Sequence, residues 1–233
     1  MRRVWMILLS LLVLTVPARA AEDKWVALTF DDGPSGALTE QLLDGLSARS
    51  IHATFFVCGY RVAQYPAALR RIAADGHEIG LHSDKHDYMQ HMTLAEVTDD
   101  LTRCQAAVFD CCGVDAHLFR PPGGLYSDNL LRASGDLGLP VILWSVDPED
   151  WDAKKAATVL PTIRKEVFPG SIILMHDLHE SSVEAALCAV DELQSQGYRF
   201  CTVSELAERS GTALQAGHVY SAFRPVDEST HTE

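Results

Sequence analysis

Two adjacent carboxylates, Asp31 and Asp32, end an apolar run in the segment TFDDGP at residues 29–34. Neighbouring like charges repel each other, so this pair needs either full solvation in a turn or a positive partner. His82 and His86, in the segment HSDKH, are four residues apart, and two imidazoles at this spacing can approach one cation. Asp32 would complete a set of two histidines and one carboxylate that leaves coordination positions open. Asp31 could then face the water that the cation activates.

Taken alone, a histidine pair at this spacing is weak evidence, because such pairs also occur on surfaces and in cores. The positions of other reactive side chains strengthen the interpretation. His82, Arg120, Asp147 and His176 each end a different predicted strand, as the pair of aspartates does. In an α/β barrel the C-terminal ends of the strands face one side, and that side carries the active site. We therefore expect these side chains to converge on one rim.

Apolar segments with β-forming composition alternate along the chain with segments of helical periodicity. This alternation predicts parallel strands covered by helices. No glycine-rich fingerprint follows the first strand, so a distorted (β/α) barrel with about seven parallel strands is favoured over an open dinucleotide-binding sheet. The predicted strands are residues 24–30, 53–57, 78–83, 117–120, 141–146, 171–176 and 198–203. The predicted helices are residues 38–47, 66–75, 93–109, 129–137, 153–167 and 183–194.

The domain organisation follows from the two ends of the chain. Residues 1–20 combine two arginines, an apolar run at 4–16 and an A-x-A cleavage pattern at 18–20, as a secretory signal peptide does. The run is shorter than the ~20 residues that a spanning helix needs, so an uncleaved membrane anchor is less favoured. We expect a single catalytic domain at residues 21–210. Residues 211–233 are polar and lack periodicity, which predicts a loose tail.

Charge and cysteine content exclude several classes of partner. The chain has a formal net charge of −13, and loss of residues 1–20 with their three arginines would make it −16. Such an acidic protein is a poor candidate for binding nucleic acid, and it gains no electrostatic attraction to anionic lipid. The six cysteines are compatible with disulfides in an exported protein, and equally with unpaired thiols, but their spacing is not that of a zinc finger.

Five motifs in order resemble those of the polysaccharide deacetylases of carbohydrate esterase family four, the NodB-homology domain. The resemblance extends from about residue 25 to residue 206, and the motifs follow predicted strands. They are TFDDGP at 29–34, HSDKH at 82–86, RPPGG at 120–124, DPEDW at 147–151 and LMH at 174–176.

This resemblance implies a role for each reactive side chain. Asp32, His82 and His86 would bind a divalent metal, usually zinc in relatives and sometimes cobalt or nickel. The metal would polarise the acetyl carbonyl and lower the pKa of a water molecule. Asp31 would take a proton from that water as general base, and His176 would protonate the leaving amine as general acid.

Two further charges would orient these catalysts. Arg120 resembles the arginine that holds the base carboxylate and keeps Asp31 ionised. Asp150 resembles the acidic partner of His176, and Asp147 is a less favoured candidate for that role. The segment DPED is also a good turn and helix-start sequence, so a purely structural role for both aspartates stays open.

The remaining site residues would contact the substrate. The backbone N–H of Gly123 would donate to the developing oxyanion, while Trp151 and Leu174 would form an apolar pocket for the acetyl methyl group, although either could be core. Many relatives carry an aromatic residue or an arginine at the position of Gly123. Tyr126 is a candidate to replace that missing side chain.

The implied function is that of an exported, metal-dependent hydrolase that removes N-acetyl groups from an amino-sugar polysaccharide. Peptidoglycan is the first candidate if the source is bacterial, and chitin-type oligomers are the second. O-deacetylation of xylan, a non-catalytic carbohydrate-binding relative and a plain metal-binding protein remain as alternatives. The expected location is secreted or at the cell wall, with no stable membrane span in the mature chain.

Overall fold

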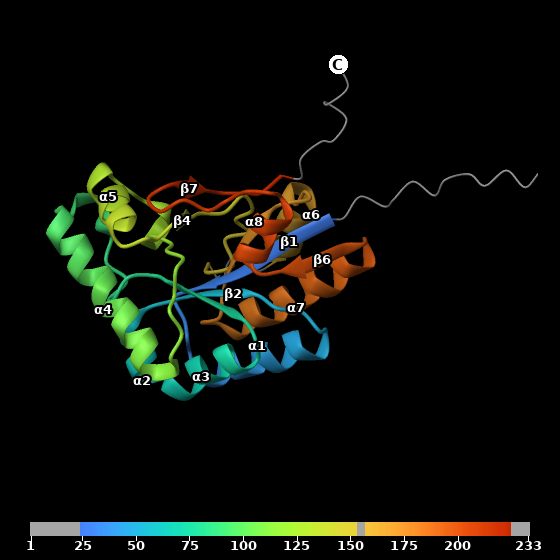
Figure 1. Cartoon of the computed structure of the whole chain (residues 1–233). Coiled ribbons are helices and arrows are strands. Elements are labelled where there is room, and N and C mark those ends of the chain that lie inside the picture. Colours follow the sequence, from blue (N-terminus) through green and yellow to red (C-terminus); the bar gives the residue numbers. More distant parts are fainter. Residues whose placement is uncertain (1–23, 153–156, 225–233) are drawn as a thin grey trace, which may run out of the picture.

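Strand β1 (Lys24–Asp31) runs through the middle of the fold, with strands paired on both of its sides (Figure 1). This computed structural model describes residues 24–152 and 157–224, so the predicted signal peptide lies outside the described residues. Every residue from Val26 to Asp31 is buried. A strand that is covered on both faces needs apolar side chains at consecutive positions, and the sequence VALTF supplies them.

The main sheet is parallel, with the order β3-β2-β1-β5, and β6 pairs with the first half of β1. Single-residue bridges join Leu81 to Phe119, Phe119 to Val141, and Val146 to Ile173. These bridges close the path from β3 back to β5, which confirms the predicted distorted α/β barrel. The other strands are β2 (Thr54–Val57), β3 (Glu78–Leu81), β4 (Val141–Ile142), β5 (Ile172–His176), β6 (Tyr198–Cys201) and β7 (Val219–Tyr220).

Two predicted strands are shorter in the structure than in the sequence pattern. The segment 117–120 forms a bridge only at Phe119, and the segment 141–146 is a strand only at β4. The Arg120 side chain gives the physical reason, because its Nε and Nη2 donate to the carbonyls of Ile142 and Leu143, each at 3.0 Å. A guanidinium therefore takes acceptors that a continuous ladder would otherwise use.

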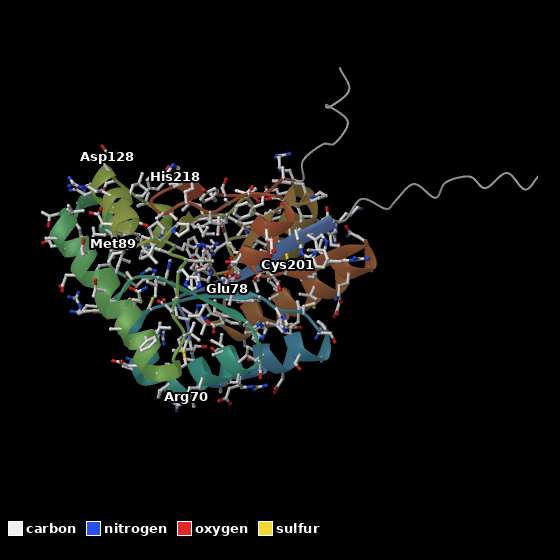
Figure 2. All side chains as sticks on the ribbon, viewed as in Figure 1. Arg70, Glu78, Met89, Asp128, Cys201 and His218 are labelled. Carbon is white, nitrogen blue, oxygen red and sulfur yellow. The ribbon has the colours of Figure 1, made fainter. Side chains whose placement is uncertain are left out.

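Helices and side chains fill the space around the strands (Figures 1 and 2). The long helix α4 begins with the predicted capping box, in which Thr93 and Glu96 satisfy each other's backbone N–H groups, and it ends at Gly113 in the left-handed conformation. The predicted helix at 153–167 lies partly outside the described residues. The helices are α1 (Ala37–Ala48), α2 (Gly59–Gln64), α3 (Pro66–Ala74), α4 (Leu94–Cys112), α5 (Asp128–Asp136), α6 (Val159–Glu166), α7 (Glu180–Ser195) and α8 (Val203–Arg209), with short 3₁₀ turns η1 (Met89–His91) and η2 (Pro122–Gly124).

Residues 211–224 differ from the expected loose tail. Strand β7 pairs in parallel with β4, and Phe223 is buried, with its N–H donating to the Gly170 carbonyl at 2.8 Å. The rings of Tyr220 and Phe223 stack at 5.6 Å. Two aromatic side chains in a polar stretch are enough to dock this segment, although they give no periodic pattern.

All six cysteines lie within the described residues and are free thiols, and Cys58, Cys104 and Cys201 are buried. Within residues 24–152 and 157–224, no helix has the length and apolar character that crossing a bilayer requires.

Candidate active site

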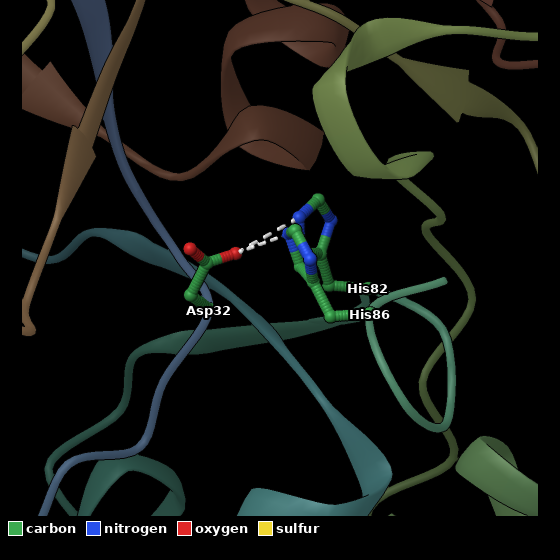
Figure 3. A group of neighbouring side chains, drawn as sticks. All are labelled: Asp32, His82 and His86. Atoms are coloured by element: carbon green, nitrogen blue, oxygen red, sulfur yellow. Dashed lines mark ion pairs between the residues drawn. The ribbon is translucent and has the colours of Figure 1, made fainter. Parts of the chain in front are cut away.

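Asp32, His82 and His86 come together at the C-terminal ends of β1 and β3 (Figure 3). Asp32 Oδ1 lies 3.2 Å from His82 Nε2 and 2.9 Å from His86 Nε2. One carboxylate oxygen and two imidazole nitrogens lie within 4.8 Å of one another and could supply three of the four ligands of a tetrahedral metal site.

The local hydrogen bonding fits a metal between these atoms. Asp32 Oδ1 is buried and accepts no hydrogen bond, although both imidazoles face it. His82 Nδ1 lies 2.7 Å from the Arg120 carbonyl, which can only accept, so the proton is on Nδ1 and the Nε2 lone pair is available. Burial raises the pKa of the Asp32 carboxyl, but the two histidines outweigh this and hold its pKa well below the usual value. A nitrogen, nitrogen and oxygen donor set of this kind suits zinc and similar divalent metals.

The loop that carries the two histidines has an unusual backbone. Ser83 and His86 have φ values of 65° and 63°, in the left-handed region that non-glycine residues seldom adopt. The Ser83 hydroxyl accepts the His86 N–H at 2.7 Å. Backbone N–H groups of Gly59 and Tyr60, in the first turn of α2, donate to the carbonyls of Ser83 and Asp84 at 3.1 and 2.8 Å.

Helix α4 holds the same loop from its other side. The Asp84 N–H donates to the buried carboxylate of Asp100 at 2.8 Å, and Arg103 Nε contacts Asp84 at 3.1 Å. A Cβ on Gly59 would lie 2.4 Å from Asp84 Oδ1, so only glycine lets α2 approach this closely. The strained conformation is therefore fixed by contacts from two helices.

Asp31 lies beside the cluster of Asp32, His82 and His86 and is held by Arg120. Arg120 is fully buried, and its Nη1 donates to Asp31 Oδ1 and to Thr29 Oγ1, both at 2.7 Å. The other carboxylate oxygen, Asp31 Oδ2, lies 3.7 Å from His82 Nε2 and so faces the cluster. Burial lowers the pKa of the Arg120 guanidinium, and the Asp31 carboxylate opposes that shift.

His176 ends β5 and is held by Asp150. One oxygen of the Asp150 carboxylate accepts the His176 backbone N–H at 2.8 Å, and the other lies 2.8 Å from Nδ1. Burial alone would lower the pKa of His176, but the Asp150 carboxylate and the nearby Asp31 and Asp32 raise it to about 9. The structure therefore pairs His176 with Asp150, while Asp147 Oδ1 accepts the Glu149 N–H at 3.0 Å, as turn chemistry predicts.

A pocket of about 380 Å³ opens over these groups. Its lining includes every predicted metal ligand, the predicted base and acid, Gly123, Trp151 and Leu174. Arg120 and Asp150 lie behind this lining as buried partners of Asp31 and His176. The structure thus brings the predicted metal ligands, base, acid, orienting residues and substrate contacts to one place, and Asp147 also lines the pocket, whereas Tyr126 does not.

Other residues at the site were not singled out. Tyr88 and Trp144 also line the pocket. Asp177 is buried behind it, where the Thr39 hydroxyl donates to its carboxylate, Ser35 Oγ donates to its carbonyl at 2.5 Å, and burial raises the carboxyl pKa to about 6. In the sequence, these two residues could have been found only by their position beside a motif. Tyr88 follows HSDKH by two residues, and Asp177 follows LMH directly.

Comparison with known proteins identifies the family of this chain. The profile of the polysaccharide deacetylase family matches residues 18–142. The chain belongs to this family. The peptidoglycan-N-acetylglucosamine deacetylase PgdA of Listeria monocytogenes is 38% identical over 202 residues, which are 87% of this chain and 42% of PgdA.

Solved structures of the family have the same fold. A T48 deacetylase determined with substrate is 38% identical, with a TM-score of 0.80 over 85% of this chain and 97% of the other. A family 4 acetyl xylan esterase from Clostridium thermocellum, determined with a cobalt ion, is 32% identical, with a TM-score of 0.79 over 85% and 98% of the two chains. The chain spans about two fifths of the length of the first curated relatives, so its overall activity is treated below as a proposal.

The contacts of α4 with the loop that carries His82 and His86 lead us to expect that α4 affects metal binding. In Asp100→Ala the Asp84 N–H loses its acceptor, so the strained loop relaxes and zinc affinity falls about tenfold, as when other outer partners of metal ligands are removed. Competition with a fluorescent zinc chelator measures this change.

Two matched variants control the experiment. Asp100→Asn keeps an acceptor oxygen and should retain most of the affinity. Asp99→Ala removes an exposed carboxylate from the same helix, one that forms an ion pair with Nη1 of Arg103, and should bind zinc as the parent does. Unchanged affinity in Asp100→Ala would show that α4 does not hold the loop.

Proposed function

We propose that this protein is an exported, metal-dependent deacetylase that removes N-acetyl groups from an amino-sugar polysaccharide, with peptidoglycan as the first candidate and chitin-type oligomers as the second. The observation that carries the proposal is the pairing of Asp31 with His176. These residues are direct register partners on adjacent parallel strands, and both line the pocket. Each has its own buried charged partner, which is what a base and an acid with fixed roles need.

Asp32, His82 and His86 would hold the metal, with zinc as the first candidate and cobalt or nickel as alternatives. When bound there, a divalent metal lowers the pKa of a water molecule and polarises the acetyl carbonyl. Asp31 Oδ2 takes the proton of the attacking water, while Oδ1 stays bound to Arg120. Because Asp31 Oδ2 lies near His82, the base and the ligand set act on the same small volume.

His176 then supplies the proton that the leaving nitrogen needs. Its Nδ1 points to Asp150, so Nε2 is the atom available to the pocket. With a pKa near 9 the imidazole is protonated at neutral pH and can act as the acid. The Gly123 N–H would stabilise negative charge on the carbonyl oxygen, and Leu174 with Trp151 would enclose the acetyl methyl group.

Support for an amino-sugar substrate comes from the peptidoglycan deacetylases among the relatives. The acetyl xylan esterase among the structural neighbours keeps O-deacetylation of xylan as a second candidate, since the same site chemistry serves an ester. A non-catalytic relative would be expected to lack the base, a ligand or the final histidine, and this chain has all of them. The predicted signal peptide supports export, which would bring the protein to peptidoglycan in the cell wall.

One assay separates these candidates. Acetate release is measured with and without added zinc on chitooligosaccharides, peptidoglycan fragments and acetylated xylan. The proposal expects zinc-dependent release from the first two and little from xylan. Preferential release of acetate from xylan would support the esterase alternative. Absence of acetate release from every substrate would contradict the proposal that the protein is a deacetylase.

Substitution of the proposed base and of a proposed metal ligand should have different effects on zinc binding. Asp31→Asn should reduce acetate release at least about 100-fold while zinc still binds, because the proton acceptor is lost and the three candidate ligands are kept. His82→Ala should lose zinc and activity together, because it removes a ligand. Zinc content by elemental analysis, with acetate release on the same samples, distinguishes the two results.

Folding must be checked in Asp31→Asn, because the change leaves the buried Arg120 without its counter-charge. Loss of one partner from a buried ion pair costs about 3–5 kcal/mol, so thermal unfolding is measured in parallel. A folded, zinc-bound Asp31→Asn protein with full activity would remove the base assignment.

The Asp150 carboxylate should set the alkaline limit of activity. A general acid works only while protonated, so activity falls as pH rises through the His176 pKa of about 9. Asp150→Asn removes the negative charge that raises this pKa, so the alkaline limb of the kcat/KM profile should move to lower pH by about one unit or more. Asp147→Asn is the control and should leave the limb in place. An unchanged limb in Asp150→Asn would contradict the pairing.

A further inference from the structure

Tyr88 is the most exposed of the large apolar side chains on the described residues, at 61%, and it also lines the pocket. An exposed aromatic ring is informative where it borders a binding pocket, because its apolar body can be buried against a ligand. Trp151, 53% exposed, is the other strongly exposed aromatic residue of the pocket lining. Among the described residues, two of the three large apolar side chains that are more than half exposed therefore lie at the site, and the third is Phe109.

The Tyr88 ring is held from behind. It packs over the backbone of Gly123, where a Cβ would lie 2.8 Å from Tyr88 Cε1, so the ring occupies the space that a side chain at position 123 would need. It also meets the His86 ring nearly edge-on, with centroids 6.3 Å apart. The next residue, Met89, is fully buried and anchors the chain there. One side of the ring is thus supported, and the other faces outward.

The size of the pocket indicates which part of a substrate the outward face of the Tyr88 ring would contact. Small-molecule sites range from about 300 to about 1,000 Å³, so about 380 Å³ is near the lower end and suits a single sugar unit over the metal cluster. The neighbouring units of a polymer must then lie over the rim. Tyr126, the residue expected from the sequence to shape this region, is 45% exposed but does not line the pocket.

We propose that Tyr88 binds the sugar unit adjacent to the one that is deacetylated, by packing its ring against the apolar face of that sugar. This inference rests on the proposed function and names a subsite within it. A neutral sugar face suits an aromatic platform in an acidic protein, which has no surplus of positive charge for an anionic ligand. The support behind the ring means that little side-chain freedom is lost on binding.

The test uses N-acetylglucosamine oligomers of two and four units with the zinc-loaded protein. Tyr88→Ala should raise KM for the tetramer about fivefold to tenfold with kcat little changed, because an interaction made equally in the ground and transition states is removed. The dimer should be affected less. Tyr88→Phe should behave as the parent, since the ring and not the hydroxyl makes the contact. Tyr126→Ala, which alters an exposed tyrosine outside the lining, is the matched control and should also behave as the parent.

Two measurements keep the outcome decisive. Calorimetry measures binding of the tetramer to Asp31→Asn, with and without the additional change Tyr88→Ala. This tests the sugar contact even if the parent protein releases no acetate. Absence of acetate release would count against the proposed function and not against the subsite. Zinc affinity of Tyr88→Ala is measured as well, because Tyr88 touches a metal ligand. Equal losses on dimer and tetramer with weaker zinc binding, or no loss on the tetramer, would overturn the subsite.

Discussion

The buried ion pair between Arg120 and Asp31 is the interaction on which the rest of the site depends. Two adjacent carboxylates cannot both be buried near a cluster of histidines without positive charge to offset them. Arg120 supplies that charge to Asp31 from inside the barrel, and Asp32 is left to the histidines. The two carboxylates of the TFDDGP segment therefore have separate partners, a guanidinium for Asp31 and two imidazoles for Asp32.

The same guanidinium also completes the fold. Its donors reach β1 through Thr29 and Asp31, the end of β4 through the Ile142 carbonyl, and the residue after β4 through the Leu143 carbonyl. Thr29 in turn donates to the Ile173 carbonyl on β5 at 2.8 Å. Where the strand ladders are reduced to single bridges, these side-chain bonds join the walls of the barrel. Arg120 therefore joins the strands and holds the proposed base at the same time, and its planar set of five donors suits it to bonds in several directions.

Much of this arrangement could be predicted from the sequence. Near-continuous apolar strands that alternate with helices specify a parallel barrel, and the strand-end rule places the motif residues on one rim. Residues outside the motifs could not be found in this way. Tyr88 and Asp177 have roles that depend on what packs against them, and neither the exposure of one nor the burial of the other is visible in composition. Strand β7 was missed because two aromatic residues, rather than a periodic pattern, dock it.

The central claim is that Asp32 and the two histidines share one cation while Asp31 stays outside its ligands as the base. A crystal structure of the zinc-soaked protein, with an anomalous map at the zinc edge, tests it most directly. We predict one peak about 2.0–2.2 Å from a carboxylate oxygen of Asp32 and from Nε2 of His82 and His86, with Asp31 still bound to Arg120. A zinc ion ligated by Asp31, or one that binds elsewhere and leaves these three residues empty, would contradict the account.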